Sequence, residues 1–123
     1  MRCPQPIPSS GAPLRSVTCM VPNGEDASFV PTLAAFLETR MVDGPEGSYS
    51  HAVMVDSVLA RRKIMEEAFE VCLDMGESTV HEQRLAEEAA DLVFHLLCGL
   101  TGAGVAWSDV EKVLVERHRK GSK

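Results

Sequence analysis

Aromatic residues are scarce in this sequence, and long hydrophobic runs are missing. Only 5% of the 123 residues are Phe, Trp or Tyr, although 45% are hydrophobic in total. β-Sandwich cores usually hold more aromatic and β-branched side chains, so this composition favours helices packed on helices. Because no stretch of about 18 apolar residues occurs, the sequence predicts no membrane-spanning helix. The length is enough for one domain with a single core.

Positive charge is also in short supply. The chain has 12 Lys and Arg residues against 18 Asp and Glu residues, which gives a formal net charge of −6. This balance argues against a general surface for nucleic acid or anionic membranes. A polyphosphate ligand would therefore need clustered basic side chains or a bound divalent metal.

The few cysteines do not form a C-x-x-C pair. Cys72 and Cys98 lie within apolar helical patterns, where a free thiol packs as a small hydrophobic group. We therefore expect reduced thiols and a reducing compartment, and the predicted location is cytoplasmic.

Residues 1–24 differ in composition from the rest of the chain. They are rich in Pro, Ser and Gly and have no hydrophobic periodicity, so they are predicted to be a disordered N-terminal tail. Residues 25–123 are predicted to form one all-α domain, since no segment alternates clearly like a strand. Hydrophobic periodicity predicts a bundle of about four helices, near residues 29–40, 50–75, 79–100 and 108–119.

Three local signals predict where these helices begin and end. Thr79-x-x-Glu82 and Ser108-x-x-Glu111 match the capping box, which opens a helix by satisfying its free backbone N–H groups. Gly76 fits the position that follows the last residue of a helix.

Two pairs of acidic residues stand at the same spacing on consecutive predicted helices. Glu67 and Glu70 are three residues apart on the second helix, and Glu88 and Asp91 are three residues apart on the third. On a helical wheel each pair adjoins the edge of the apolar stripe, whereas solvated charges usually lie opposite it. If the two stripes pack together in antiparallel fashion, the four carboxylates face one groove.

Carboxylates gathered in a half-buried groove repel one another unless a cation binds between them. All-oxygen ligand sets select hard divalent ions, and Mg²⁺ needs few protein ligands because it keeps waters and binds substrate phosphates. The pattern therefore predicts a magnesium site. The alternative is a solvated acidic face, which is the usual explanation for any single pair of this kind.

Several other side chains are candidates for substrate contact. Lys63 lies on the acidic side of its helix and, with Arg62, could bind phosphate, but an i, i+4 ion pair with Glu67 explains it equally well. Ser48 and Tyr49 could line a nucleotide pocket or simply belong to a loop.

The acidic pattern Glu66-Glu67-x-x-Glu70, followed by Glu88-x-x-Asp91, resembles the E-E-x-x-E…E-x-x-D signature of a known superfamily. These are the all-alpha nucleoside triphosphate pyrophosphohydrolases, which are also called MazG-like. Flanking segments from about residue 29 to residue 120 are most similar to the phosphoribosyl-ATP pyrophosphohydrolase family of histidine biosynthesis.

The resemblance implies a homodimer, or a dimer of dimers, that hydrolyses phosphoribosyl-ATP to phosphoribosyl-AMP and pyrophosphate. It implies catalytic roles for Glu66, Glu67 and Glu70, with Glu66 as an outer-shell or base candidate. By the same resemblance, the Mg²⁺ ligands would be Glu67, Glu70, Glu88 and Asp91.

Two other functions stay open at this point. The segment before Lys63 departs from the family pattern, which leaves room for a house-cleaning enzyme that acts on other nucleoside triphosphates. A helical dimerisation module that keeps the fold without turnover is the third possibility. Both would retain the predicted bundle.

Overall fold

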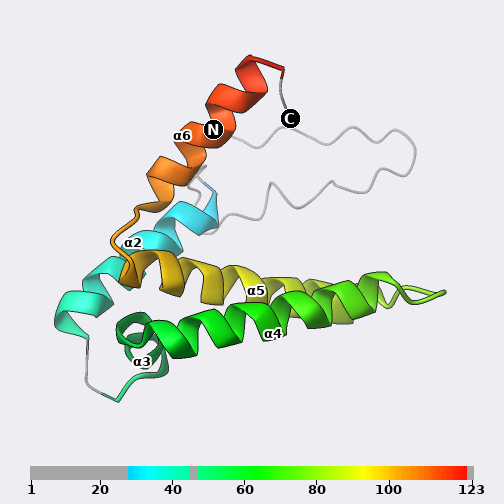
Figure 1. The fold of residues 1–123 in the computed structure, drawn as a ribbon, viewed down its shortest axis with the longest axis horizontal. Coiled ribbons are helices and arrows are strands. Elements are labelled where there is room, and N and C mark those ends of the chain that lie inside the picture. The colour runs from blue at the N-terminus through cyan, green and yellow to red at the C-terminus, as the bar shows by residue number, and fades with distance from the viewer. Residues whose placement is uncertain (1–27, 45–46, 122–123) are drawn as a thin grey trace. The chain divides into compact units, whose positions relative to one another are not determined.

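The structure is a computed structural model that describes residues 28–44 and 47–121, and these residues are helical with short connections (Figure 1). No strand occurs within these two ranges, so the predicted all-α class is confirmed. The predicted tail, residues 1–24, lies outside the described residues. The helices are α2 (Phe29–Asp43), α3 (Tyr49–Val55), α4 (Ser57–Met75), α5 (Glu82–Gly102) and α6 (Trp107–Arg119).

The helix predicted for residues 50–75 is wrong in one respect, because it is divided into α3 and α4. Asp56 between them has an extended backbone, with φ −121° and ψ 97°. Its carboxylate accepts hydrogen bonds from the backbone N–H groups of Val58, at 3.0 Å, and Leu59, at 3.2 Å. Asp56 therefore caps α4 and satisfies N–H groups that a new helix leaves free.

Neither predicted capping box forms. The N-cap of α5 is His81, whose Nδ1 accepts from the backbone N–H of Arg84 at 3.2 Å. The N-cap of α6 is Ala106, which makes no side-chain capping bond. The carboxylate of Glu111, expected in the second box, instead accepts from Trp107 Nε1 at 2.9 Å.

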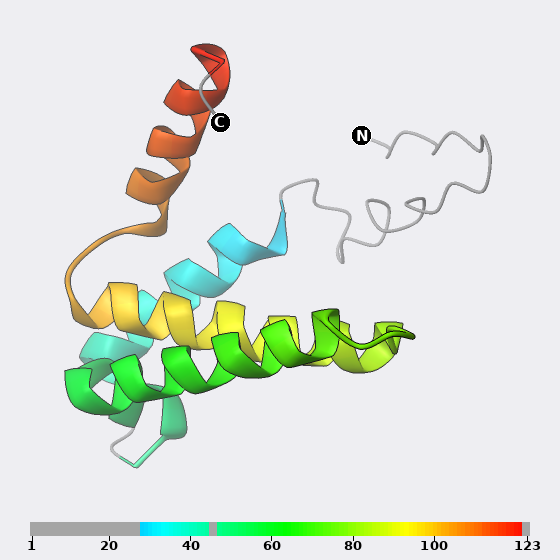
Figure 2. The ribbon, with the colours of Figure 1, turned by 45° about the vertical axis from the view of Figure 1, so that its right-hand side comes forward.

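The two long helices α4 and α5 run antiparallel and lie side by side along their length (Figures 1 and 2). Ala60 and Val71 of α4 and Leu97 of α5 are buried where these helices meet. Side chains of α4 pack closely on α5 at Gly99, where a Cβ atom would lie 3.0 Å from the Cδ1 atom of Ile64. This packing is what brings the edges of α4 and α5 together.

The short helix α3 also packs on α5. Its Val53 and Met54 are buried. A Cβ atom at Gly102, near the end of α5, would overlap the carbonyl oxygen of Met54. The absence of a side chain at Gly102 thus permits α3 to lie against α5.

The helix α2 extends three residues beyond the predicted end at residue 40 and buries Ala34 and Leu37. The chain forms two compact units that meet at Leu33, so nearly all the described residues belong to the unit 34–123.

In the described ranges no helix is, by itself, long and apolar enough to cross a membrane. Only α5 and α6 taken together are long and apolar enough, and they are bent by 110° relative to each other.

Candidate functional site

Three of the predicted acidic residues meet in one cluster between α4 and α5. Glu67 of α4 and Glu88 and Asp91 of α5 each offer a carboxylate oxygen, and these oxygens lie within 4.8 Å of one another. The side chain of Glu67 is only 13% exposed. We call Glu67, Glu88 and Asp91 the acidic trio. It forms because residues three apart share a helix face and the two faces adjoin.

Glu70, the fourth predicted ligand, is not a member of the acidic trio. Glu70 lies one turn along α4 from Glu67 and is exposed to solvent. Its negative charge contributes to the raised pKa of Glu88. The geometry therefore brings together three of the four predicted ligands, and a metal-binding role for Glu70 stays a prediction.

The surroundings of Glu88 disfavour its charged form. Its carboxyl pKa is raised above the ordinary value, first because of desolvation and then because of the charges of Glu70, Asp74, Glu67 and Asp91. Both the desolvation and the neighbouring charges disfavour another negative charge at this point. A bound cation would offset the repulsion.

The acidic trio suits a hard divalent ion. Its donors are carboxylate oxygens, which Mg²⁺ and Ca²⁺ prefer. Because their oxygens lie within 4.8 Å of one another, these three carboxylates could hold one ion between them. The residues present therefore fit the predicted magnesium site.

Lys63 forms ion pairs with both members of the adjacent acid pair. Its Nζ atom lies 3.2 Å from Oε1 of Glu66 and 3.7 Å from Oε2 of Glu67. The hydrogen bond with Glu66 is the main reason why the pKa of Lys63 is raised. The i, i+4 pair considered from the sequence is thus present, and it holds an ammonium group beside the acidic trio.

Glu66 lies on the outer side of this arrangement. Its half-exposed carboxylate is shared between Lys63 and Arg62, whose Nε atom is 3.9 Å away. It does not belong to the acidic trio. Arg62 is 63% exposed.

Ser48 and Tyr49 both have partners within the protein. Ser48 caps α3, because its Oγ atom accepts from the backbone N–H of His51 at 3.2 Å. The Tyr49 hydroxyl lies 2.8 Å from Nε2 of His95 on α5, while the tyrosine as a whole is 51% exposed. The predicted contacts of Ser48 and Tyr49 with substrate stay predictions.

Sequence reasoning missed the hydrogen bond between Tyr49 and His95, since the two residues are 46 positions apart and nothing in either motif pairs them. It also missed the ion pair between Arg84 Nε and Asp74, at 3.2 Å. A signal for Asp74 existed, because it lies one turn beyond Glu70 on the acidic edge of α4.

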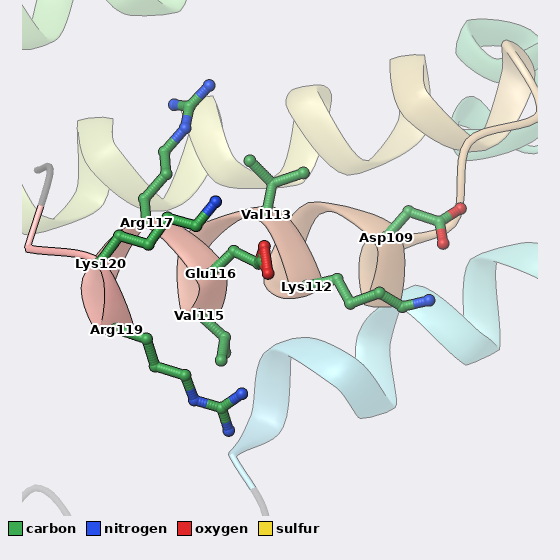
Figure 3. A pocket seen from close by; sticks show the side chains of 8 residues that line it. All are labelled: Asp109, Lys112, Val113, Val115, Glu116, Arg117, Arg119 and Lys120. Atoms are coloured by element: carbon green, nitrogen blue, oxygen red, sulfur yellow. The ribbon is translucent and has the colours of Figure 1, made fainter.

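A separate hollow lies along α6 and is lined by basic, acidic and apolar side chains (Figure 3). Its basic side chains are Lys112, Arg117, Arg119 and Lys120, its acidic ones Asp109 and Glu116, and its apolar ones Val113 and Val115. Its described lining comes from α6 and from Lys120, which follows it, and includes none of the acidic trio.

Comparison with known proteins agrees with this geometry. A family model described as phosphoribosyl-ATP pyrophosphohydrolase matches residues 30–118. The chain belongs to the phosphoribosyl-ATP pyrophosphohydrolase family. The match includes the acidic trio, Lys63, Tyr49 and His95, whereas the predicted tail at residues 1–24 lies outside it.

The relatives of this chain differ in how much of their own length it covers. The chain is 37% identical over 86 residues to a phosphoribosyl-ATP pyrophosphatase of Nitrobacter winogradskyi, covering 69% of this chain and 72% of that one. It is 42% identical over 91 residues to the histidine biosynthesis bifunctional protein HisIE of Thermus thermophilus, covering 72% of this chain and 41% of that protein.

A histidine biosynthesis trifunctional protein of Neurospora crassa is 40% identical over 85 residues, which are 69% of this chain but 9% of that protein. The chain thus spans less than half the length of these multifunctional relatives. No solved structure matches it.

Proposed function

We propose that this chain hydrolyses phosphoribosyl-ATP to phosphoribosyl-AMP and pyrophosphate with the help of Mg²⁺. The observation that carries the proposal is the acidic trio, whose oxygens lie within 4.8 Å of one another inside the segment that matches the family. The name of the Nitrobacter relative supports the substrate. A solvated acidic face would not need a Glu67 side chain that is only 13% exposed, nor a Glu88 carboxyl whose pKa is raised first by desolvation and then by the neighbouring acids.

In this proposal Glu67, Glu88 and Asp91 hold the metal, and Glu70 completes the ligand set from the next turn of α4. When bound, such an ion neutralises charge on the phosphates and activates water. Phosphoryl chemistry depends mainly on positioning and charge stabilisation, so few other protein groups are required.

The remaining roles fall to the neighbours of the acidic trio. Lys63 brings a positive charge within 3.7 Å of Glu67 and can exchange its carboxylate partners for a substrate phosphate, with Arg62 available from the exposed side of α4. Glu66 is the base candidate, because its carboxylate is not used in the acidic trio and can accept a proton from the attacking water. Ser48 and Tyr49, at the start of α3, are the candidates to border the nucleotide.

The direct test is pyrophosphate release from phosphoribosyl-ATP by the purified protein, with and without Mg²⁺. We expect release only with metal, and a loss of at least about 100-fold in kcat/KM for Glu67→Gln and Glu70→Gln. The matched control is Glu87→Gln, which changes an exposed acid on α5 whose carboxylate accepts from Gln83 at 2.9 Å. It should leave release within about 2-fold of the unmodified chain.

A panel of nucleoside triphosphates, assayed in parallel, tests the substrate. A preference for any of them over phosphoribosyl-ATP would replace the proposed substrate with that of a house-cleaning enzyme. No release from any nucleotide, at high protein concentration and millimolar Mg²⁺, would contradict catalysis and favour a non-catalytic module.

We also infer that two copies of the chain associate through α4. Its face opposite the acidic edge exposes four large apolar residues, an arrangement that monomers rarely tolerate as a continuous patch. The exposed fraction is 62% for Val58, 70% for Met65, 62% for Phe69 and 52% for Leu73. A homodimer, or a dimer of dimers, would cover this stripe with a second copy.

The proposed location is the cytoplasm. Cys72 and Cys98 both have free thiols, and burial raises the pKa of the Cys98 thiol to about 11, so that it stays protonated and unreactive. Structural thiols of this kind are typical of a reducing compartment.

A further inference from the structure

A line of hydrogen bonds connects the start of α3 to the backbone of Asp91. The Tyr49 hydroxyl lies 2.8 Å from His95 Nε2, and His95 Nδ1 lies 2.8 Å from the carbonyl oxygen of Asp91. The imidazole therefore bridges a residue on one helix and a proposed metal ligand on another.

The carbonyl partner assigns the direction of the bond to Asp91, and the charge of the ring then sets the direction of the bond to Tyr49. A carbonyl oxygen can only accept, so Nδ1 of His95 must carry a hydrogen and donate it to Asp91. In a neutral imidazole the other nitrogen is then an acceptor, and the Tyr49 hydroxyl donates to Nε2. Replacing the hydroxyl therefore leaves Nε2 without its hydrogen-bond partner.

Packing holds the imidazole in this orientation. His95 is 6% exposed, and the rings of Tyr49 and Phe94 meet it edge-on, with centroids 5.6 Å and 5.3 Å away. A buried polar ring that loses a hydrogen-bond partner is destabilised, so the ring and the two partners favour one another.

We propose that Tyr49 and His95 are positioning residues for Asp91. In an α-helix the carbonyl of Asp91 already accepts from the backbone N–H of His95, and the imidazole adds a second bond to the same oxygen. This fixes the turn of α5 that carries Asp91, so its carboxylate stays within reach of Glu67 and Glu88. The inference rests on the proposed function, and it gives the Tyr49 hydroxyl a role other than substrate contact.

The geometry has a parallel in known metal sites. Hydrogen bonds to the groups that carry the ligands orient those ligands, and their loss typically lowers metal affinity by about 10–100-fold. Here the support reaches the ligand through its backbone, so an effect toward the lower end of that range is expected. A purely structural bond would lower stability without changing metal affinity.

The test is the magnesium dependence of thermal unfolding, measured without substrate. Tyr49→Phe removes only the hydroxyl and keeps the ring that stacks against Phe94. We expect the Mg²⁺ concentration for half-maximal stabilisation to rise about 10-fold. Trp107→Phe, which removes a comparable side-chain bond on α6, is the control and should leave this concentration unchanged.

A double-mutant cycle separates positioning from substrate contact. His95→Asn keeps an amide able to bond the Asp91 carbonyl but removes the acceptor for Tyr49. If the line acts as one unit, Tyr49→Phe should have no further effect on magnesium dependence in the His95→Asn background. If Tyr49→Phe instead raises only the KM for phosphoribosyl-ATP, equally in both backgrounds, the positioning role is overturned.

The outcomes also separate this inference from the proposed function. If Mg²⁺ stabilises the unmodified chain but no pyrophosphate is released from phosphoribosyl-ATP, the proposed substrate is wrong. The magnesium midpoint of Tyr49→Phe then still decides the positioning role. An unchanged magnesium midpoint in Tyr49→Phe, with normal turnover in the unmodified chain, would overturn the positioning role alone. No magnesium response in the unmodified chain would overturn both.

Discussion

At the scale of single residues, Glu88 is the acid whose ionisation is disfavoured by desolvation and by the neighbouring carboxylates. Its carboxyl pKa is raised in the folded protein, so the folded state binds this proton more tightly than the unfolded state. Without metal, stability is therefore lost as pH rises from the ordinary pKa of 4.5 through the higher folded value. We expect Glu88→Gln to be more stable than the unmodified chain at pH 7 in EDTA, and this advantage to shrink toward pH 4.

Thermal unfolding at a series of pH values, with and without Mg²⁺, measures this difference. With saturating Mg²⁺ the order should reverse, because only the unmodified chain gains stability from the ion. Identical pH profiles for the two proteins in EDTA would contradict the charge crowding described for Glu88.

The residues of the site were only partly predictable from sequence. The acidic pairs could be found because the helical period puts residues three apart on one face. Which members converge depends on how α4 and α5 pack, so Glu70 could not be separated from Glu67 beforehand. The hydrogen bond between Tyr49 and His95 depends on the packing of α3 against α5, which no local pattern specifies.

At the scale of helices, Asp56 decides where α4 begins. Its carboxylate accepts from two backbone N–H groups, and Asp56→Ala leaves both without this partner. We expect a loss of about 1 kcal/mol in the free energy of unfolding, measured in urea. Ser108→Ala is the control, because Ser108 belongs to a predicted capping box that does not form, and it should change the free energy by less than about 0.5 kcal/mol. Equal losses in both variants would contradict the capping role of Asp56.

The break at Asp56 also explains why one long helix was predicted there. Apolar residues recur at helical spacing on both sides of it, and no Gly or Pro interrupts the pattern. Asp both opens helices and occurs within them, so only the backbone conformation distinguishes the two cases.

Close approach of α3 and α5 provides a second prediction at this scale. In Gly102→Ala the new Cβ atom would overlap the Met54 carbonyl oxygen, so one helix must move. We expect a loss of about 1–3 kcal/mol in the free energy of unfolding, despite the better helix propensity of alanine. Gly76→Ala is the matched control, because its φ is −87° and its nearest neighbouring atom would be 3.5 Å away. A Gly102→Ala variant as stable as Gly76→Ala would contradict this packing.

At the scale of the whole molecule, composition and periodicity were sufficient to predict an all-α chain, because few aromatics and a 3.6-residue pattern leave few other solutions. They could not predict how many helices would form, since that number depends on local breaks such as Asp56. They also could not predict which apolar residues stay exposed. Met65 and Phe69 are apolar like the buried residues of α4, and only the packing of the helices shows that their side chains are exposed to solvent.

This outward stripe leads to a prediction about assembly. Phe69 is 62% exposed on α4 and lies one turn from Met65, so a charge at Phe69 would be buried without a partner if a second copy covered the stripe. We expect sedimentation equilibrium to show a dimer or larger species at micromolar concentration and a monomer for Phe69→Glu. Val42→Glu changes a residue that is 80% exposed on α2 and should leave the assembly intact. A monomeric unmodified chain would instead leave the stripe open to solvent, and Phe69→Glu would then raise solubility without changing the molecular mass.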